Sequence, residues 1–300
     1  MADPVDVAVV GLGSMGLGIA RSVLRAGHRV LGVDIDRARV DGFVAEGGRK
    51  GTLADVAGDL DAAVIVVVNA AQTEHVLFGP DGLVPKMRPG AVVLACATVE
   101  PAFAGAMAER CAEAGVLYLD SPISGGSIKA EAGTLSVMAS GSAEAFSAAE
   151  PVLEAMAETV FRLGDTPGAG SAMKAVNQLL AGVHIAAMAE ALTFGISQGI
   201  EPATFLSVIS KCAGTSWMLE NRAPHIVAGD YTPRSAVDIW LKDLGIVLDA
   251  AKAAKFSAPL TATALQQFLA ASGSGLGGAD DSAVAKVYAR NAGLTLPGGA

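Results

Sequence analysis

Hydrophobic and polar residues follow two different patterns along the chain, and the pattern changes near residue 164. Before this point, short β-branched runs alternate with segments of helical period such as SMGLGIARSVLRAG and PAFAGAMAERCAEAG. The runs are VDVAVV, HRVLGVD, DAAVIVVV, GAVVLA, GVLYLD, TLSVMAS and TVFRL. Such a pattern is typical of a largely parallel sheet covered by helices on both faces. Residues 1–164 are therefore predicted to form an α/β domain with a doubly wound sheet.

Residues 165–300 contain no strand pattern and are predicted to form a separate all-α domain. The expected helices span about residues 169–198, 202–211, 237–254 and 259–272, followed by one that opens with DDSAVAKVY. The first of them continues as LLAGVHIAAMAEALTFGISQG with scarcely a charge on any side. This predicts a long connecting helix that is buried all round.

Composition and charge restrict the classes of protein that need to be considered. The 300 residues are 52% hydrophobic, which excludes a disordered protein and allows a substantial core. No apolar run approaches the roughly 20 residues of a membrane helix, and the start, MADPVDVAVV, lacks the positive segment of a signal peptide. A formal charge of -9 argues against nucleic-acid and anionic-lipid partners. We expect a cytoplasmic protein with no membrane association.

The three cysteines offer no framework for a disulfide or a metal site. Cys96, Cys111 and Cys212 are an odd number, lie far apart, and form no CxxC motif or matching histidine spacing. They are interpreted as small buried hydrophobic residues.

The motif GLGSMG, Gly11 to Gly16, lies between a predicted strand and a predicted helix. In this context GxGxxG indicates a dinucleotide site, where Gly11 permits the turn, Gly13 admits a pyrophosphate and Gly16 lets helix and strand pack closely. Asp34 ends the next strand, where a carboxylate binds the ribose hydroxyls and disfavours NADP relative to NAD. The nearby Arg37 and Arg39 complicate this preference. The alternative is an ordinary turn, with Asp34 as a helix cap.

A second glycine-rich segment, DSPISGG (residues 120–126), interrupts the chain directly after a predicted strand. Ser124, Gly125 and Gly126 could present a hydroxyl and consecutive backbone N–H groups to a carboxylate. The alternative is an ordinary loop.

The segment GAGSAMKAVNQ, residues 168–178, places a lysine, an asparagine and a glutamine among mostly small and apolar residues of a helix pattern. Lys174, Asn177 and Gln178 share one helical face. Desolvation lowers the pKa of a buried lysine towards neutrality, where it can exchange a proton. The alternative is that Lys174 extends from the domain junction into water.

A further helix pattern, SAVDIWLKDLG, contains Asp238 and Lys242 at positions i and i+4. The default interpretation of this pair is a salt bridge on the helix surface.

Together these motifs resemble the 3-hydroxyisobutyrate dehydrogenase family of β-hydroxyacid dehydrogenases. They are GLGSMG, the acid after the second strand, a turn from Thr98 to Pro101, DSPISGG, GAGSAMKAVNQ and KDLG, in the family's order over nearly the whole chain. The resemblance implies a Rossmann domain followed by a helical domain entered through a long helix. It also implies NAD-dependent oxidation of a short hydroxy acid, with no metal.

The same resemblance implies the roles of individual residues. Lys174 matches the catalytic lysine and Asn177 its supporting asparagine, while the loop of Ser124, Gly125 and Gly126 matches the site of the substrate carboxylate. Thr98 and Lys242 match positions that contact the nicotinamide end of the cofactor. The implied cofactor-binding residues are Gly11, Leu12, Gly13, Ser14, Met15, Gly16, Asp34, Asn69, Thr98 and Lys242.

Some segments depart from the general family pattern. The chain has Asn69-Ala70 where the family often has Leu-Pro, and Asn177-Gln178 where it usually has Asn-Asn. The segments NQLLAGVHIAAMAEAL, AGTSWMLENR and GDYTPRSAVDIWLKDLG resemble the L-threonate dehydrogenase branch, which implies conversion of L-threonate to 2-dehydro-L-erythronate. The candidate hydrogen-bond partners of this polyhydroxylated acid are Gln178, Ser216, Asn221 and His184, and the alternative for His184 is a core histidine.

Other functions remain open from the sequence. The same scaffold serves 3-hydroxyisobutyrate dehydrogenases and tartronate-semialdehyde (2-hydroxy-3-oxopropionate) reductases, and an NAD-binding sensor or scaffold is the non-enzymatic alternative. The resemblance also implies a homodimer or homotetramer assembled through the helical domain. The roles of Trp217 and Trp240 are open.

Overall fold

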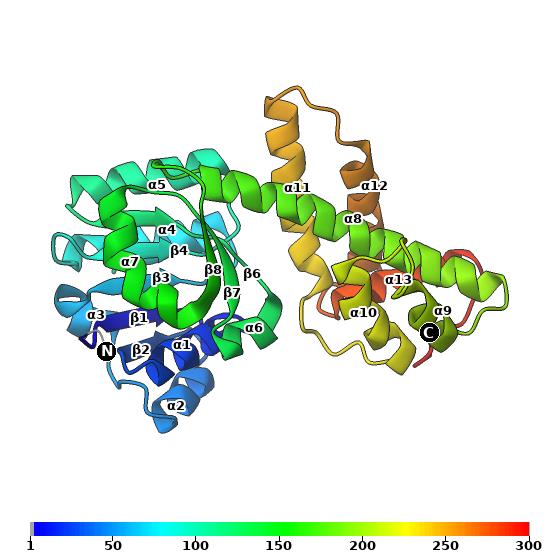
Figure 1. Ribbon diagram of the computed structural model, residues 1–300, viewed down its shortest axis with the longest axis horizontal. Coiled ribbons are helices and arrows are strands. Elements are labelled where there is room, and N and C mark those ends of the chain that lie inside the picture. Colours follow the sequence, from blue (N-terminus) through cyan, green and yellow to red (C-terminus); the bar gives the residue numbers. More distant parts are fainter. Residues whose placement is uncertain (1–2, 300) are drawn as a thin grey trace. The chain divides into compact units, whose positions relative to one another are not determined.

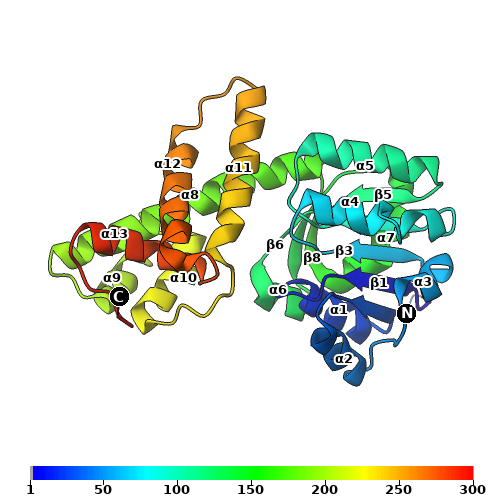
Figure 2. The same ribbon diagram turned by 180° about the vertical axis from the view of Figure 1, so that it is seen from behind.

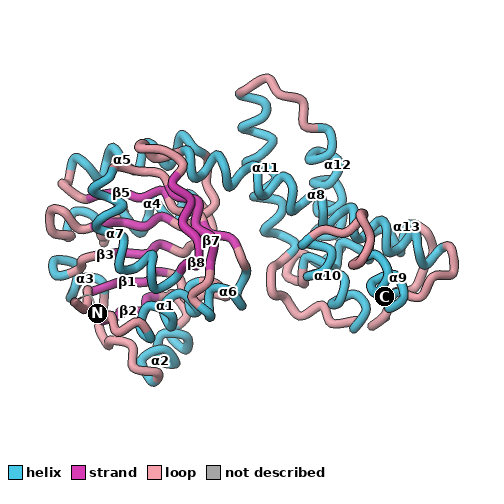
Figure 3. The backbone as a smooth tube through the Cα atoms, in the orientation of Figure 1, coloured by secondary structure: helices cyan, strands magenta, loops and turns pink. Residues whose placement is uncertain are grey.

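The structure is a computed structural model in which residues 3–299 are described. The chain forms two compact units, Met1–Lys174 and Ala175–Ala300 (Figures 1 and 2). Within the described residues, strands occur only in the first unit, and the second is built of helices (Figure 3). The predicted fold class, an α/β region followed by an all-α region, is therefore confirmed.

The first unit alternates strands and helices. Its strands are β1 (Asp6–Val10), β2 (Arg29–Val33), β3 (Ala62–Ile65), β4 (Val92–Ala95), β5 (Leu117–Asp120), β6 (Ile123–Ser124), β7 (Leu135–Ala139) and β8 (Ala157–Arg162). Its helices are α1 (Gly16–Arg25), α2 (Arg37–Ala45), α3 (Leu53–Val56), α4 (Ala70–Phe78), α5 (Pro101–Glu113), α6 (Gly126–Ala132) and α7 (Ala143–Met156), with short 3-10 turns at Ala57–Asp59 and Val84–Lys86.

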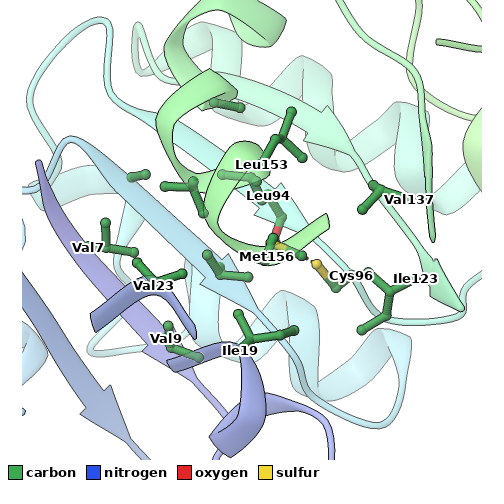
Figure 4. Packing of buried hydrophobic residues seen from close by; sticks show 14 of the residues in the cluster. Val7, Val9, Ile19, Val23, Leu94, Cys96, Ile123, Val137, Leu153 and Met156 are labelled. Atoms are coloured by element: carbon green, nitrogen blue, oxygen red, sulfur yellow. Dashed lines mark hydrogen bonds between the residues drawn. The ribbon is translucent and has the colours of Figure 1, made fainter. Parts of the chain in front are cut away.

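Five parallel strands form the main sheet in the order β2-β1-β3-β4-β5. Successive side chains of a strand point to opposite faces of a sheet. In β1, Val7 and Val9 accordingly join a core formed with α1 and α7 (Figure 4), while Ala8 and Val10 join another formed with α4 and α5. The sheet is thus covered on both faces, as the uninterrupted apolar runs predicted.

The runs TLSVMAS and TVFRL form strands outside the main sheet. They contribute β7 and β8 to a three-stranded sheet, in which β6 pairs antiparallel with β7, and β7 pairs parallel with β8. Pro122, which has no backbone N–H, separates β5 from β6. Asp120 at the end of β5 forms an antiparallel bridge with Ser140, so the two sheets meet at this residue.

The second unit contains most of α8 together with five further α-helices. These helices are α8 (Ala169–Ser197), α9 (Pro202–Ile209), α10 (Trp217–Ala228), α11 (Val237–Ala253), α12 (Pro259–Ala271) and α13 (Ala285–Asn291), with short turns at Ser272–Leu276 and Asp281–Val284. Helix α10 is absent from the helices expected from the sequence. It contains Pro224 in its interior, a residue that normally ends a helical pattern.

Buried charges are part of the core of the second unit. Asp281 is fully buried and accepts hydrogen bonds from Arg222 Nε at 2.5 Å and from Trp240 Nε1 at 2.9 Å. Trp240 also stacks on Phe268 with their ring centroids 5.6 Å apart. Trp240 is therefore a core residue that holds a buried carboxylate.

Helix α8 differs from the prediction in its surroundings. Within the described chain it exposes Met173, Val176, Leu180 and Phe194, so the expectation of a helix buried all round is wrong. Met173, Val176 and Leu180 are spaced by three and four residues, and Phe194 follows about four helical turns later, so all four lie on one face. By length and apolar composition, α8 could cross a membrane. The core helices of soluble proteins can share both properties, and 44% of the most apolar 18-residue window of α8 is buried.

Two of the three cysteines behave as predicted. Cys96 and Cys111 are buried, and burial raises the pKa of each thiol to about 12. The prediction is wrong for Cys212, which lies in the exposed turn after α9.

Candidate active site

The GLGSMG turn is fixed by backbone contacts that require glycine. Gly11 has φ +95° and its N–H donates to Val33 O at 2.7 Å, which ties the end of β1 to β2. A Cβ on Gly16 would lie 1.7 Å from Gly11 O. A Cβ on Gly13, by contrast, would meet only Arg39 Nη1 at 3.8 Å, so the backbone there is open to a ligand.

Asp34 closes this turn from the neighbouring strand. Its Oδ2 accepts from Leu12 N at 2.7 Å and its Oδ1 from Asp36 N at 2.8 Å. The cap of α2 is Asp36, whose side chain accepts from Ala38 N, so Asp34 is not the helix cap of the alternative interpretation. Arg39 Nη1 lies 3.9 Å from Asp34 Oδ2, within ion-pair distance.

A hollow of about 600 Å³ lies beside this turn. Leu12, Gly13 and Ser14 line it from the turn, with Arg39 and Ser127 contributing from other segments. Met15 and Gly16 begin α1, whose first N–H groups favour an anion. An open glycine backbone, a helix N-terminus and a carboxylate on the adjacent strand fit a dinucleotide.

Two more predicted cofactor residues follow strands of the same sheet. Asn69 follows β3 and caps α4, because its Oδ1 accepts from Gln72 N at 2.9 Å. Thr98 follows β4 in the loop before α5. The carboxyl ends of parallel strands share one edge of a sheet, so Asn69, Thr98 and the GLGSMG turn follow that edge.

The start of α8 is anchored by Asp120, a residue to which the sequence analysis gave no role. Asp120 Oδ2 accepts from Gly168 N at 2.9 Å and Ser171 N at 2.8 Å, and Oδ1 accepts from Ser171 Oγ at 2.7 Å. Burial raises the pKa of Asp120, and the hydrogen bonds from Ser171 and Gly168 oppose this. The signal in the sequence was a carboxylate at the end of an apolar strand. A Cβ on Gly170 would lie 2.3 Å from Met138 O, so glycine permits this close contact.

This anchor places Lys174 next to the DSPISGG segment. Lys174 is 8% exposed, and its Nζ donates to Ile123 O at 2.8 Å. Ile123 immediately precedes Ser124, which ends β6. Gly125 and Gly126 follow with φ of +133° and +73°, a conformation that favours glycine. The alternative in which Lys174 extends into water is wrong, because its ammonium is buried and hydrogen-bonded.

The polar residues after Lys174 are linked to each other, and Gln178 contacts α11. Asn177 Nδ2 donates to Gln178 Oε1 at 2.9 Å, and Gln178 Nε2 donates to Asp243 Oδ2. Lys242 Nζ lies 2.5 Å from Asp243 Oδ1, within ion-pair distance. Asp238, the expected partner of Lys242, instead accepts from Ser272 Oγ at 2.6 Å. Asp243 belongs to the KDLG motif, but no role was predicted for it because its partner Gln178 lies far away in the chain.

The remaining substrate candidates lie in or beside α10, apart from one histidine on α8. Ser216 is the N-cap of α10 and its Oγ accepts from Leu219 N at 3.1 Å, while Asn221 Oδ1 accepts from Arg222 Nη1. Trp217 is half exposed. His184 is partly buried. Ser216 and Asn221 thus already have one protein partner each.

Two family models match consecutive parts of the chain. Residues 6–164 match the NAD binding domain of 6-phosphogluconate dehydrogenase. Residues 168–288 match a family described as NAD-binding of NADP-dependent 3-hydroxyisobutyrate dehydrogenase. Both family models thus describe parts of NAD(P)-dependent dehydrogenases.

Individual relatives match almost the whole chain. An L-threonate dehydrogenase of Cupriavidus necator is 51% identical, with 98% of both chains covered. An L-threonate dehydrogenase of Escherichia coli K12 is 48% identical, covering 97% of this chain and 96% of the relative. The crystal structure of a 3-hydroxyisobutyrate dehydrogenase from Salmonella typhimurium is 49% identical with a TM-score of 0.91, covering 94% of this chain and 99% of that one. The chain therefore belongs to the 3-hydroxyisobutyrate dehydrogenase family and, within it, to the L-threonate dehydrogenase branch of NAD-dependent hydroxyacid dehydrogenases.

Proposed function

We propose that this NAD-dependent hydroxyacid dehydrogenase oxidises L-threonate to 2-dehydro-L-erythronate, with Lys174 as the general base. The observation that carries the catalytic assignment is the buried Lys174 ammonium, held 2.8 Å from the carbonyl of Ile123 beside the Ser124 loop. The substrate assignment is supported by relatives of 48% and 51% identity that are named for this acid.

Lys174 takes the proton of the reacting hydroxyl in the oxidation and returns it to the carbonyl in the reverse direction. A lysine performs this role when it is neutral at the moment of transfer, which burial favours. Asn177 follows three residues later on α8 and supports the lysine and the reacting oxygen. Ser124, Gly125 and Gly126 bind the carboxylate through a hydroxyl and backbone N–H groups.

The hydroxyl groups of the acid need further partners. Ser216 keeps its O–H proton for donation because its Oγ lone pair serves the helix cap, and Asn221 keeps its Nδ2 because Oδ1 faces Arg222. We assign these two residues to the substrate. We also propose Gln178 as a substrate residue, because its Oε1 and Nε2 can each make a second hydrogen bond beside those to Asn177 and Asp243.

NAD supplies the redox chemistry by accepting a hydride. We propose that the residues that hold it are Gly11, Leu12, Gly13, Ser14, Met15, Gly16, Asp34, Asn69, Thr98 and Lys242. Asp34 favours NAD because its carboxylate repels a 2'-phosphate, and Arg39 lies close enough to weaken this repulsion. The ratio of kcat/KM with NAD and with NADP measures the outcome, and a preference for NADP would contradict the role of Asp34.

We further propose an NAD-binding domain of residues 1–164 and a helical substrate and oligomerisation domain of residues 165–300. The exposed apolar face of α8 (Met173, Val176, Leu180 and Phe194) supports a homodimer or homotetramer, since such faces are usually covered by a partner. We propose that this assembly is cytoplasmic. Size-exclusion chromatography with light scattering tests the assembly, and a monomer at all concentrations would contradict it.

The second candidate substrate is 3-hydroxyisobutyrate, because the structural relative of 49% identity carries that name. Initial rates of NAD reduction with L-threonate, 3-hydroxyisobutyrate and glycerate separate the possibilities, together with identification of the oxidised carbon. We expect the highest kcat/KM with L-threonate and oxidation at C2. A higher value with 3-hydroxyisobutyrate would reassign the substrate.

The role of Lys174 is tested by Lys174→Ala. Loss of a general base lowers kcat by about 10²- to 10⁴-fold, while the affinity for NAD stays close to that of the unaltered enzyme. Lys252→Ala, at an exposed position on α11, is the control and is expected to leave kcat unchanged. Near-normal turnover of Lys174→Ala would remove the lysine from the mechanism.

A further inference from the structure

Strand β8 forms an edge of the three-stranded sheet in the first unit (Figure 3). Among the described residues, β7 is the only strand that pairs with it. Leu163, which follows β8, donates its N–H to Ala139 O of β7 at 2.8 Å. The backbone groups of a strand point alternately to its two sides, so the N–H and C=O groups of Val160 and Arg162 face away from β7. Such outward groups offer hydrogen bonds to another strand.

Three side chains of β8 share one face of the sheet. Val160 packs against the core beneath α7. Glu158 Oε2 lies 3.4 Å from Lys129 Nζ on α6, and the guanidinium of Arg162 lies 4.6 Å from the ring centroid of Phe146 on α7. Glu158 and Arg162 are both exposed, and each lies two residues from Val160. The edge strand therefore carries one negative and one positive charge, placed symmetrically about Val160.

We propose that β8 pairs antiparallel with β8 of a second copy of this chain, about a two-fold axis through Val160. In a two-fold interface, the contact of one residue with another is repeated in the reverse sense. Glu158 then lies opposite Arg162 of the second copy and Arg162 opposite Glu158, so opposite charges meet at both ends. On the other face Phe161, which is 49% exposed, lies opposite Thr159 of the second copy, an aromatic and β-branched pair.

The order of the charges selects this partner and this direction. Charges on an edge strand usually prevent pairing with other strands. Two charges of one sign at positions 158 and 162 would repel in the two-fold arrangement, whereas one acid and one base attract. A parallel arrangement in register would bring each charge against its like. The strand is therefore complementary to itself in the antiparallel direction only.

This interface is distinct from the exposed face of α8 on which the proposed oligomer rests. Strand β8 belongs to the first unit, whereas Val176, Leu180 and Phe194 belong to the second. Either interface alone makes a dimer, and two different two-fold interfaces together make a tetramer. The pairing of β8 thus favours the homotetramer over the homodimer.

The experiment reverses one charge at a time. Glu158→Arg leaves two positive side chains at the edge and Arg162→Glu leaves two negative ones, so neither variant is complementary to itself. The two variants are complementary to each other. Size-exclusion chromatography with light scattering measures the mass of each variant alone and of their equimolar mixture. Glu109→Arg, at an exposed position on α5, controls for the same change of charge elsewhere in the first unit.

We expect the mass of each single variant to fall to about half that of the unaltered protein, and the mixture to recover it. The double variant Glu158→Arg/Arg162→Glu is again complementary to itself and should keep the mass of the unaltered protein, as should Glu109→Arg. Unchanged masses of both single variants would overturn the inference. Halved masses that neither mixing nor the double variant restores would also overturn it, because the charges would then not pair across the interface.

The ratio of masses separates this inference from the other proposals. If the face of α8 makes no contact between copies, the unaltered protein is a dimer and the single variants are monomers, which still supports the pairing of β8. An unaltered protein that is a monomer at all concentrations contradicts both interfaces. Initial rates with L-threonate test the proposed function separately, because Glu158 and Arg162 have no assigned part in the reaction.

Discussion

The two units hold their functional groups in different ways. In the first unit, backbone geometry carries the candidate site: the glycine turn at Gly11, the strand ends, and the start of α8, whose N–H groups bind Asp120. In the second unit, carboxylates buried among the helices hold polar and charged partners, with Asp281 against Arg222 and Asp243 against Gln178 and Lys242. A turn that needs glycine gives a recognisable sequence pattern, whereas a buried carboxylate whose partner lies far away in the sequence gives none.

The comparison predicts that the second unit is most sensitive to loss of charge. Asp281→Ala leaves Arg222 buried without its partner and removes the acceptor of Trp240 Nε1. Breaking a buried pair costs about 3–5 kcal/mol, and we expect urea unfolding to show a loss of this size. The control Asp230→Ala breaks an exposed pair with Arg234, which water screens, and should have a much smaller effect on unfolding. Equal effects of the two variants would contradict the distinction.

The first unit should instead be most sensitive to a single added methyl group. Gly16→Ala places a Cβ 1.7 Å from Gly11 O, which forces the turn apart. We expect a loss of about 1–3 kcal/mol in unfolding free energy and a weaker binding of NAD by isothermal titration calorimetry. Gly105→Ala, in α5 with no atom within 4 Å of the new Cβ, is the control and should be neutral or stabilising. Normal NAD binding by Gly16→Ala would show that the turn does not require glycine.

The same distinction explains how much could be predicted from the sequence. The sheet and the glycine turn were predictable because each depends on a local pattern of strand or turn. The pattern around Lys174 left its burial open, and only the resemblance to the family assigned it a catalytic role. Asp243 and Asp281 were not predictable, since their partners Gln178 and Arg222 lie far away in the sequence. Helix α10 was missed for a related reason: Pro224 opposes a helix locally, and tertiary packing of residues such as Ile226 overrides it.

Ser216 sharpens the comparison, because one side chain is assigned both a structural and a binding role. Ser216→Ala removes the N-cap of α10 and should cost about 1 kcal/mol in urea unfolding. Ser216→Asp retains a capping oxygen and should keep the stability. If Ser216 also binds the substrate, the aspartate repels the anionic acid and raises its KM. An unchanged KM in Ser216→Asp would restrict Ser216 to the cap.

The smallest expected effect concerns an ion pair at the edge of the first unit. The hydrogen bond from Arg29 lowers the pKa of Asp6 below 3.8, and the charge of Arg49 lowers it further. Because the folded-state pKa is depressed, Asp6 stabilises the fold above pH 3.8, and this contribution is lost as the pH falls through the folded-state value. Asp6→Asn removes the titrating group, so the difference in unfolding free energy between the two proteins should shrink in acid. We expect at most about 1 kcal/mol, since Arg29 is half exposed and water screens the pair. A difference that stays constant from pH 7 to about pH 3 would show that Asp6 acts through its hydrogen bonds and not through its charge.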